Sequence, residues 1–356
     1  MEAFSIVIPT KNQGPFLERL LSYYCDRRLN APILIADASD ESQAVSIRNN
    51  VERASRHLSI EYKLYPPDIE FVEKLVDLMP LVRTEFAVLG ADDDFFTLSG
   101  LRSTAEFLQT HPDFSIAHGH ALIFEVEPGP VYGTNLRTAS YTQRNVEIDG
   151  GTARIVDHLS RYSTTWYSMH RTGHLKRNIE KVSQSGVDFI FFTELLASCL
   201  SVIQGKMKKL DCLYMVRQSY PRKRYHLPTP FDGITGSAWP EYYRRFQDCL
   251  VRELADIDQV SPNDAIEAVK QGFWQYLNKT MSSGWQHRYG RQTASASLKQ
   301  KLAARMPRLP HMWQRGKSLF GGEENQMLLP SLLRSSSPYH ADFMPIYQAI
   351  GGGAVK

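Results

Sequence analysis

Three consecutive aspartates, Asp92, Asp93 and Asp94, are the residues of this 356-residue chain most suited to chemistry. They come one residue after the run 86–90, whose apolar residues are typical of a buried strand. Ionising three adjacent carboxylates beside apolar residues is costly, because like charges repel and burial favours the neutral form. A cation or a donor-rich ligand would remove this cost. The run therefore predicts a binding site for such a ligand where this strand ends.

Two more polar clusters follow predicted strands earlier in the chain. Residues 9–12 (PTKN) end the first apolar run, and residues 37–40 (DASD) end the second. In an open parallel sheet, ligands bind beyond the carboxyl ends of the strands. Polar clusters at three strand ends therefore predict a nucleotide site. For any single cluster, the alternative is a solvated strand end.

The first hundred residues alternate between strand patterns and helix patterns. Strands are predicted at residues 4–9, 31–36, 60–64 and 85–90, and helices at residues 15–28, 41–55 and 72–79. Alternation at this spacing indicates βαβ units. It predicts an α/β fold with a Rossmann-like, mostly parallel central sheet flanked by helices.

The remainder of the chain is predicted to be richer in helix. Helices are expected at residues 98–109, 152–161, 188–204, 241–256 and 264–281, and strands at residues 114–126 and 209–218. Residues 128–150 contain several Pro and Gly residues and are predicted to form a loop.

The composition is ordinary for a soluble globular protein, with 42% hydrophobic and 22% charged residues. A net charge of +3 is too small to indicate a nucleic-acid partner. The four cysteines lie far apart without a CxxC pair, which disfavours a zinc site or disulfide framework and fits a reducing compartment. No apolar run is long enough for a signal peptide or a spanning helix. We therefore expect a cytoplasmic location, with peripheral attachment to the inner face of the membrane as the alternative.

Residues 5–10 (SIVIPT), 33–40 (ILIADASD) and 88–94 (VLGADDD) together resemble the GT-A-fold glycosyltransferases of the family 2 type. The resemblance covers roughly residues 3–225 and depends on the order and spacing of these short motifs. It implies an inverting transfer of a sugar from a nucleotide-sugar donor to a hydroxyl of a glycan, lipid-linked or protein-linked acceptor. A UDP-sugar is the favoured donor, and a GDP-sugar is the alternative.

In this family a DxD motif holds Mn²⁺ or Mg²⁺ against the donor diphosphate, so the resemblance implies that Asp92 and Asp94 are metal ligands. Oxygen ligands suit such a hard cation, which also neutralises the leaving group. Asp93 would then face the sugar or a backbone donor. Because the usual family form is closer to Asp-x-Asp-Asp, the pair Asp93–Asp94 stays open as the alternative.

The resemblance also assigns residues to the nucleotide. Pro9, Thr10 and Asp37 would frame the base and ribose. Asp40 is a further candidate, with capping of the helix that begins near residue 41 as its alternative role. Lys74 lies on the helix before the DxD strand, where family members often place a residue that reaches the nucleotide; a solvated lysine is the alternative.

An inverting displacement needs a general base for the acceptor hydroxyl. In the family, this base is an acid at the start of a late helix, and Asp188 occupies that place. Its alternative role is a helix cap. Glu194 is the second candidate, because an acid within so apolar a helix must face a cleft or find a partner.

Family members often carry a basic segment after the last strand, and it closes over the diphosphate. By this resemblance Arg217 and Arg224, with their basic neighbours, would contact phosphate, and His226 would ligate the metal. The QxxRW motif and membrane helices of processive polysaccharide synthases are missing from the sequence, which favours a single-transfer enzyme.

We divide the chain into a catalytic domain at residues 1–230, a helical region at 231–320 and a flexible tail at 321–356. The helical region would serve acceptor, membrane-surface or dimer contacts. Within it, residues 288–317 contain eight Lys or Arg and no acid, which suits an anionic membrane, a homodimer contact or a solvated helix.

Two other functions stay open. A sugar-nucleotide nucleotidyltransferase would share the α/β fold and the metal carboxylates, but residues 8–15 lack the Gly-rich basic loop of that class. A non-catalytic glycan- or partner-binding protein on a decayed GT-A domain is the second. The intact aspartate run argues against decay, whereas Val187 stands where the family has an acid before the base.

Overall fold

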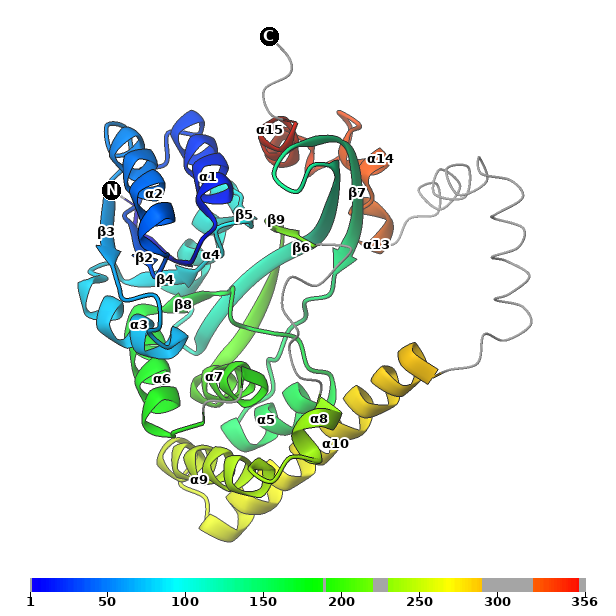
Figure 1. Cartoon of the computed structure of the whole chain (residues 1–356). Helices are drawn as coiled ribbons and strands as arrows, with labels where there is room; N and C mark the ends of the chain where they lie inside the picture. The colour runs from blue at the N-terminus through cyan, green and yellow to red at the C-terminus, as the bar shows by residue number, and fades with distance from the viewer. Residues whose placement is uncertain (1, 188–189, 220–229, 290–322, 352–356) are drawn as a thin grey trace.

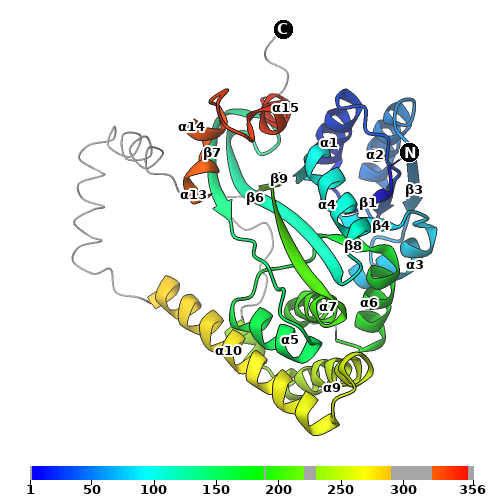
Figure 2. The same cartoon turned by 180° about the vertical axis from the view of Figure 1, so that it is seen from behind.

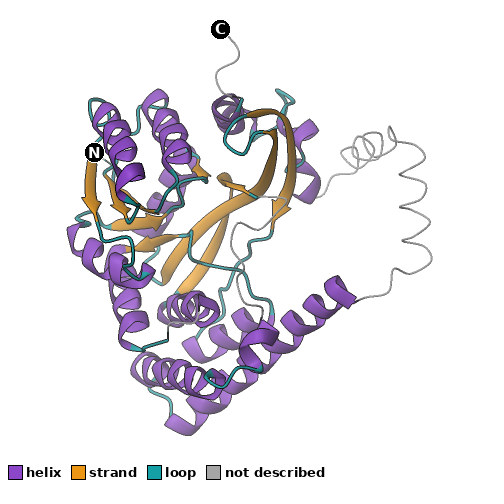
Figure 3. Cartoon of the chain, in the orientation of Figure 1, coloured by secondary structure: helices purple, strands orange, loops and turns teal. Residues whose placement is uncertain are grey.

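The computed structural model describes residues 2–187, 190–219, 230–289 and 323–351 (Figure 1). A single sheet runs through the molecule, and helices cover both of its faces (Figure 3). The predicted fold class, an α/β fold with a central sheet flanked by helices, is therefore confirmed.

The first four strands form a parallel ladder in the order β3-β2-β1-β4. Their side chains alternate between the two faces, as the period of two in a strand requires. Ile6 and Ile8 pack with the apolar residues of α1 and α2, whereas Val7 packs with those of α3 and α6. The elements are β1 (Phe4–Thr10), α1 (Gly14–Asp26), β2 (Ile33–Asp37), α2 (Glu41–Ala54), β3 (Ile60–Leu64), α3 (Phe71–Leu78) and β4 (Phe86–Leu89).

The sheet continues beyond β4 with strands of both directions. β8 runs antiparallel to β4 and to β6, and β9 runs parallel to β6. The carboxyl ends of β1, β2, β4, β6 and β9 therefore lie at the same edge of the sheet. The elements are β5 (Phe95–Phe96), α4 (Leu98–Thr110), β6 (Phe114–Pro128), β7 (Gly133–Tyr141), α5 (Gly151–Ser160), β8 (Met169–Arg171), α6 (Thr172–Gln184), α7 (Ile190–Gln204) and β9 (Lys206–Gln218).

The loop predicted at residues 128–150 is wrong in its first part. β6 and β7 form a hairpin, and β7 pairs with β6 alone at the margin of the sheet. Gly133 allows the two strands to meet, because a Cβ there would lie 2.2 Å from the Glu127 carbonyl oxygen. Apart from the buried Leu136, the residues of β7 are half-buried or exposed, and they lack the apolar alternation that would have predicted a strand. The short strands β5 and β8 and the helix α6 were also not predicted.

Helices α9 (Trp239–Asp258) and α10 (Pro262–Tyr289) confirm the two predicted helices of this region. They pack on α5 and α7 around a second apolar cluster that includes Phe192, Phe246 and Phe273. The short helix α8 (Pro230–Ile234) lies beside α10. The helical region therefore shares a core with the preceding domain.

The tail expected to be flexible at 321–356 instead contains three helices within its described part, residues 323–351. These are α13 (Glu323–Gln326), α14 (Leu329–Leu332) and α15 (His340–Ile350), which lie beside the β6–β7 hairpin (Figure 2). Met327, Phe343 and Ile346 are buried in the same apolar cluster as β1 and α1, and their burial holds the segment in place. Among the described residues, no helix has both the length and the apolar character needed to cross a bilayer.

Candidate active site

The ends of β1 and β4 are joined at the carboxyl edge of the sheet. The Thr10 hydroxyl donates to Asp92 Oδ2 at 2.6 Å, and both residues are buried. Lys74 Nζ, from α3, donates to the Thr10 carbonyl oxygen at 3.2 Å. Pro9 precedes Thr10 in β1 and pairs with Ala36 of β2. The bonds thus bring two strand ends and a buried lysine to one place.

Lys74 is 4% exposed, so its alternative role as a solvated lysine is wrong. Burial lowers the pKa of its ammonium group to about 8, although Asp37 and Asp92 oppose this shift by favouring the charged form. The amphipathic pattern of α3 buries Lys74 beside Leu75 and Leu78. A buried cation between two carboxylates is a suitable partner for an anionic ligand.

Asp37 ends β2 and is fully buried. Its Oδ1 accepts from the Ser39 backbone N–H at 2.8 Å, and its Oδ2 accepts from the Tyr62 hydroxyl at 2.7 Å. Asp40 stands at the start of α2, but its side chain makes no capping bond there and accepts instead from Asn12 Nδ2 at 2.8 Å. The loops after β1 and β2 are thereby connected. We call Thr10, Asp37, Lys74 and Asp92 the parallel-edge cluster.

Asp94 is turned toward β9. Its Oδ1 accepts from the Gln218 backbone N–H at 2.8 Å, and its Oδ2 lies 3.7 Å from Arg217 Nε. Burial, followed by the charge of Asp93, raises the pKa of Asp94 to about 8, against the lowering effect of Arg217. Asp93 is half-buried, and its carbonyl oxygen accepts from Arg19 at 3.0 Å. The three aspartates therefore have three different environments.

Arg217 of β9 lies between two tyrosines. Its Nη1 donates to the Tyr141 hydroxyl at 3.2 Å, and its Nη2 donates to the Tyr167 hydroxyl at 3.3 Å. Its guanidinium carbon also lies 5.6 Å from the Tyr141 ring centre and 4.7 Å from that of Tyr167. Burial raises the pKa of both tyrosine hydroxyls. These contacts hold the guanidinium in one orientation beside Asp94.

Glu194 of α7 lies close enough to Arg217 and its two tyrosines to influence them electrostatically. Between Phe192 and Ile203 it is the one exposed residue, whereas the others are buried. Its Oε1 accepts from the Tyr162 hydroxyl at 2.9 Å. Arg217, Tyr141 and Tyr167 each interact electrostatically with both Asp94 and Glu194. We call Glu194, Arg217, Tyr141 and Tyr167 the tyrosine–arginine cluster.

Three of the predicted site residues lie outside the described residues: Asp188, Arg224 and His226. Sequence reasoning missed Tyr141, Tyr162 and Tyr167. No motif marks Tyr141, because it ends a strand that was predicted as loop. Tyr162 and Tyr167 belong to the segment before β8, another unpredicted strand.

The two clusters meet at Asp94 and supply complementary chemistry. The parallel-edge cluster offers carboxylates and a buried ammonium group to a polar, anionic ligand. The tyrosine–arginine cluster offers a fixed guanidinium and an exposed carboxylate that can accept a proton. The arrangement can bind a phosphate-containing ligand and deprotonate a second molecule beside it.

A scan against protein-family models finds no match, and a search of curated proteins finds none either. Among solved structures, the chain is similar to S. aureus TarS 1–349 in complex with UDP-GlcNAc, with 14% identity and a TM-score of 0.51 over 82% of this chain and 77% of that chain. The complex of TarS 1–349 with UDP has 16% identity and a TM-score of 0.48 over 99% and 89% of the two chains. Mannosyltransferase PcManGT from Pyrobaculum calidifontis, in complex with GDP-Man and Mn²⁺, has 10% identity and a TM-score of 0.38 over 99% and 86%.

We compare the fold with the TarS complex with UDP-GlcNAc, which has a TM-score of 0.51. At 14% identity this similarity concerns the fold alone. The similarity extends over 82% of this chain and therefore includes most of its central sheet and flanking helices. The chain therefore shares the overall fold of TarS 1–349.

Proposed function

We propose that the chain is a metal-dependent inverting glycosyltransferase that moves a sugar from a nucleotide-sugar donor to a hydroxyl of a glycan, lipid-linked or protein-linked acceptor. The observation that carries this proposal is the meeting of the two clusters at Asp94. Arg217, Tyr141 and Tyr167 interact electrostatically with both Asp94 and Glu194. The residues proposed to bind phosphate and the proposed proton acceptor thus influence the same guanidinium, that of Arg217.

The parallel-edge cluster would bind the nucleotide part of the donor. Asp37 is held by Ser39 and Tyr62, and each of its oxygens keeps a further lone pair for a base or ribose donor. Pro9 and Thr10 would line the base, with Asp40 at the margin, and Lys74 would approach the phosphates. A UDP-sugar is the favoured donor, which agrees with the UDP-GlcNAc bound by TarS, and a GDP-sugar is the alternative.

The residues present fit a hard divalent cation. Asp92 and Asp94 are buried carboxyls, and because burial raises the pKa of Asp94, a bound cation would stabilise its charged form. No group of three or more His, Cys, Asp or Glu is placed to share an ion within the described ranges, so the diphosphate would complete the ligand set. Asp93 or His226 would contribute in the alternative arrangements. When bound, Mn²⁺ or Mg²⁺ supplies positive charge against the diphosphate.

Glu194 would act as the general base, with Asp188 as the alternative. Glu194 would take the proton from the acceptor hydroxyl as the acceptor oxygen bonds to the anomeric carbon. The bond from that carbon to the phosphate oxygen breaks on the opposite side, and its electron pair leaves with the nucleoside diphosphate. Arg217, held by two tyrosines, would stabilise the developing negative charge without reorganising. Arg224 would supply a second positive charge against the leaving diphosphate.

Release of nucleoside diphosphate from a panel of UDP- and GDP-sugars by the full chain tests the proposal, with Mn²⁺ and with chelator. We expect metal-dependent release with at least one donor, increased by acceptor sugars. Release of pyrophosphate from a nucleoside triphosphate and a sugar phosphate would instead support the nucleotidyltransferase. Nucleotide binding without either release would support a non-catalytic binding protein.

A further inference from the structure

An exposed apolar strip lies along helix α10. Trp274 and Trp285 of α10 are 68% and 65% exposed, although tryptophan is usually well buried. Met281 lies seven residues after Trp274 and four before Trp285, and these spacings place all three on one helical face.

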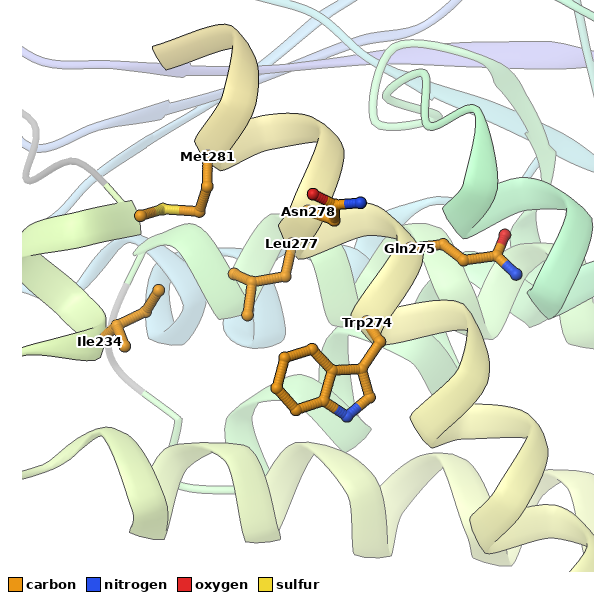
Figure 4. Close-up of a pocket in the computed structure, with 6 residues that line it drawn as sticks. All are labelled: Ile234, Trp274, Gln275, Leu277, Asn278 and Met281. Atoms are coloured by element: carbon orange, nitrogen blue, oxygen red, sulfur yellow. The ribbon is translucent and has the colours of Figure 1, made fainter. Parts of the chain in front are cut away.

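The strip continues into a groove between α8 and α10. Ile234 of α8 faces Trp274, Leu277 and Met281 of α10 across this groove (Figure 4), and its volume is about 460 Å³. Phe231, also of α8, is 57% exposed. We call Ile234, Trp274, Leu277, Met281 and Trp285 the α10 tryptophan face. A contiguous exposed apolar patch of this kind marks an interaction surface.

The acids nearest to this face in sequence are Glu267 of α10 and Asp232 of α8, and after Glu267 the charged residues of α10 are all basic. Lys270 is exposed one turn before Trp274, and residues 268–289 of α10 contain no acid. The chain that follows α10 continues the pattern, because residues 288–317 contain eight Lys or Arg and no acid. The partner that complements this surface is therefore apolar at its centre and anionic around it.

We propose that the α10 tryptophan face docks on an anionic lipid bilayer. Tryptophan prefers the boundary between headgroups and acyl chains, where its ring is buried and its N–H stays hydrated. Apolar side chains on one face of a helix with Lys and Arg nearby are typical of helices that lie on such surfaces. This inference does not depend on the proposed transfer reaction.

Co-sedimentation of the full chain with lipid vesicles tests the docking. The probes are vesicles of phosphatidylcholine alone and of phosphatidylcholine with phosphatidylglycerol. We expect binding to the anionic vesicles only, weakened by high salt because screening shortens the range of the charges. The double variant Trp274→Ala/Trp285→Ala should bind at least about 10-fold more weakly, since it loses two interfacial aromatic rings. Lys270→Glu should weaken binding by about fivefold.

The matched control is Val45→Ala/Leu64→Ala, which removes two exposed apolar side chains from α2 and β3 and should leave vesicle binding unchanged. Sedimentation velocity without lipid is run on all variants, and circular dichroism verifies their folding. Equal binding by wild type and the tryptophan variant, or no binding by either, overturns the proposal. A dimer in solution that the tryptophan substitutions dissociate also overturns it, because a second copy then occupies the face.

Discussion

The parallel-edge cluster and the tyrosine–arginine cluster meet at Asp94 but are held by different means. Thr10, Asp37 and Lys74 lie at or beside neighbouring strand ends, and backbone groups of the same ends take part in their bonds. Arg217 and Glu194 come from β9 and α7, and tyrosine side chains from other elements orient them. The first cluster follows from sheet formation, whereas the second depends on packing between distant segments. We therefore expect substitutions in the second cluster to reduce turnover more than nucleotide binding.

The largest effect is expected at Glu194. Glu194→Gln keeps the size of the side chain and its bond from Tyr162 but removes the proton acceptor, so turnover should fall by about 100- to 10,000-fold. Donor affinity should stay within about twofold, because the parallel-edge cluster is intact. Steady-state kinetics and nucleotide titration measure the two quantities. The control is Glu180→Gln, an exposed glutamate on α6. Undiminished turnover in Glu194→Gln would assign the base to Asp188.

A smaller loss is expected at Arg217. Arg217→Lys keeps the charge but cannot donate to Tyr141 and Tyr167 together, so kcat/KM should fall by about 10- to 100-fold. Arg252→Lys, at an exposed position of α9, is the control. If Arg217→Lys lost affinity for the free nucleotide as strongly as kcat, the two clusters would act as one unit, and the contrast between them would fail.

Within the parallel-edge cluster, Thr10→Val removes the donor to Asp92 with little change of shape. Nucleotide affinity should fall by about 3- to 10-fold, because one hydrogen bond to a charged group is lost. Isothermal titration gives the affinity, and a thermal melt verifies the fold. Thr110→Val, at an exposed position on α4, serves as the control. An affinity loss as large as that of Asp92→Asn would mean that Thr10 contacts the ligand directly.

The smallest effect is a pH dependence from Lys74. Its folded pKa of about 8 lies below its ordinary value of 10.5, so between these values the unfolded chain binds the proton and the folded chain does not. This group therefore makes the folded state relatively more stable as pH rises from about 8 to about 10. Denaturant unfolding should show wild type gaining stability relative to Lys74→Met across that window. A difference between the two proteins that does not vary with pH would contradict the lowered pKa of the buried Lys74.

The sequence predicted the site residues at strand ends but missed the tyrosines that long-range packing positions. Asp37 and Asp92 could be placed because Asp37 ends an apolar strand, Asp92 comes three residues after another, and parallel strands align their carboxyl ends. Tyr141 could not be placed, because β7 lacks apolar alternation and its position depends on pairing with β6. The packing of residues 323–351 was missed for a related reason. Their apolar residues are widely spaced and become buried where α13 and α14 pack on β7 and where α15 packs on α1 and β9.

The same contrast applies to the three aspartates. Their spacing predicted a shared ligand but could not show that Asp94 turns to β9 while Asp92 bonds to β1. That division follows from the antiparallel pairing of β5 with β9. β5 has only two residues, so no periodicity in the sequence reveals it. Long-range pairing of short segments is the information that the sequence pattern lacks.

Titration of UDP into the full chain by calorimetry, with Mn²⁺ and with chelator, tests the central claim most directly. Wild type is compared with Asp94→Asn and with the exposed control Asp248→Asn on α9. We predict binding that requires metal, is at least about 10-fold weaker in Asp94→Asn and is unchanged in Asp248→Asn. Metal-independent binding of equal strength in all three proteins would contradict a metal and diphosphate site at Asp94, as would the absence of binding to UDP and GDP in wild type.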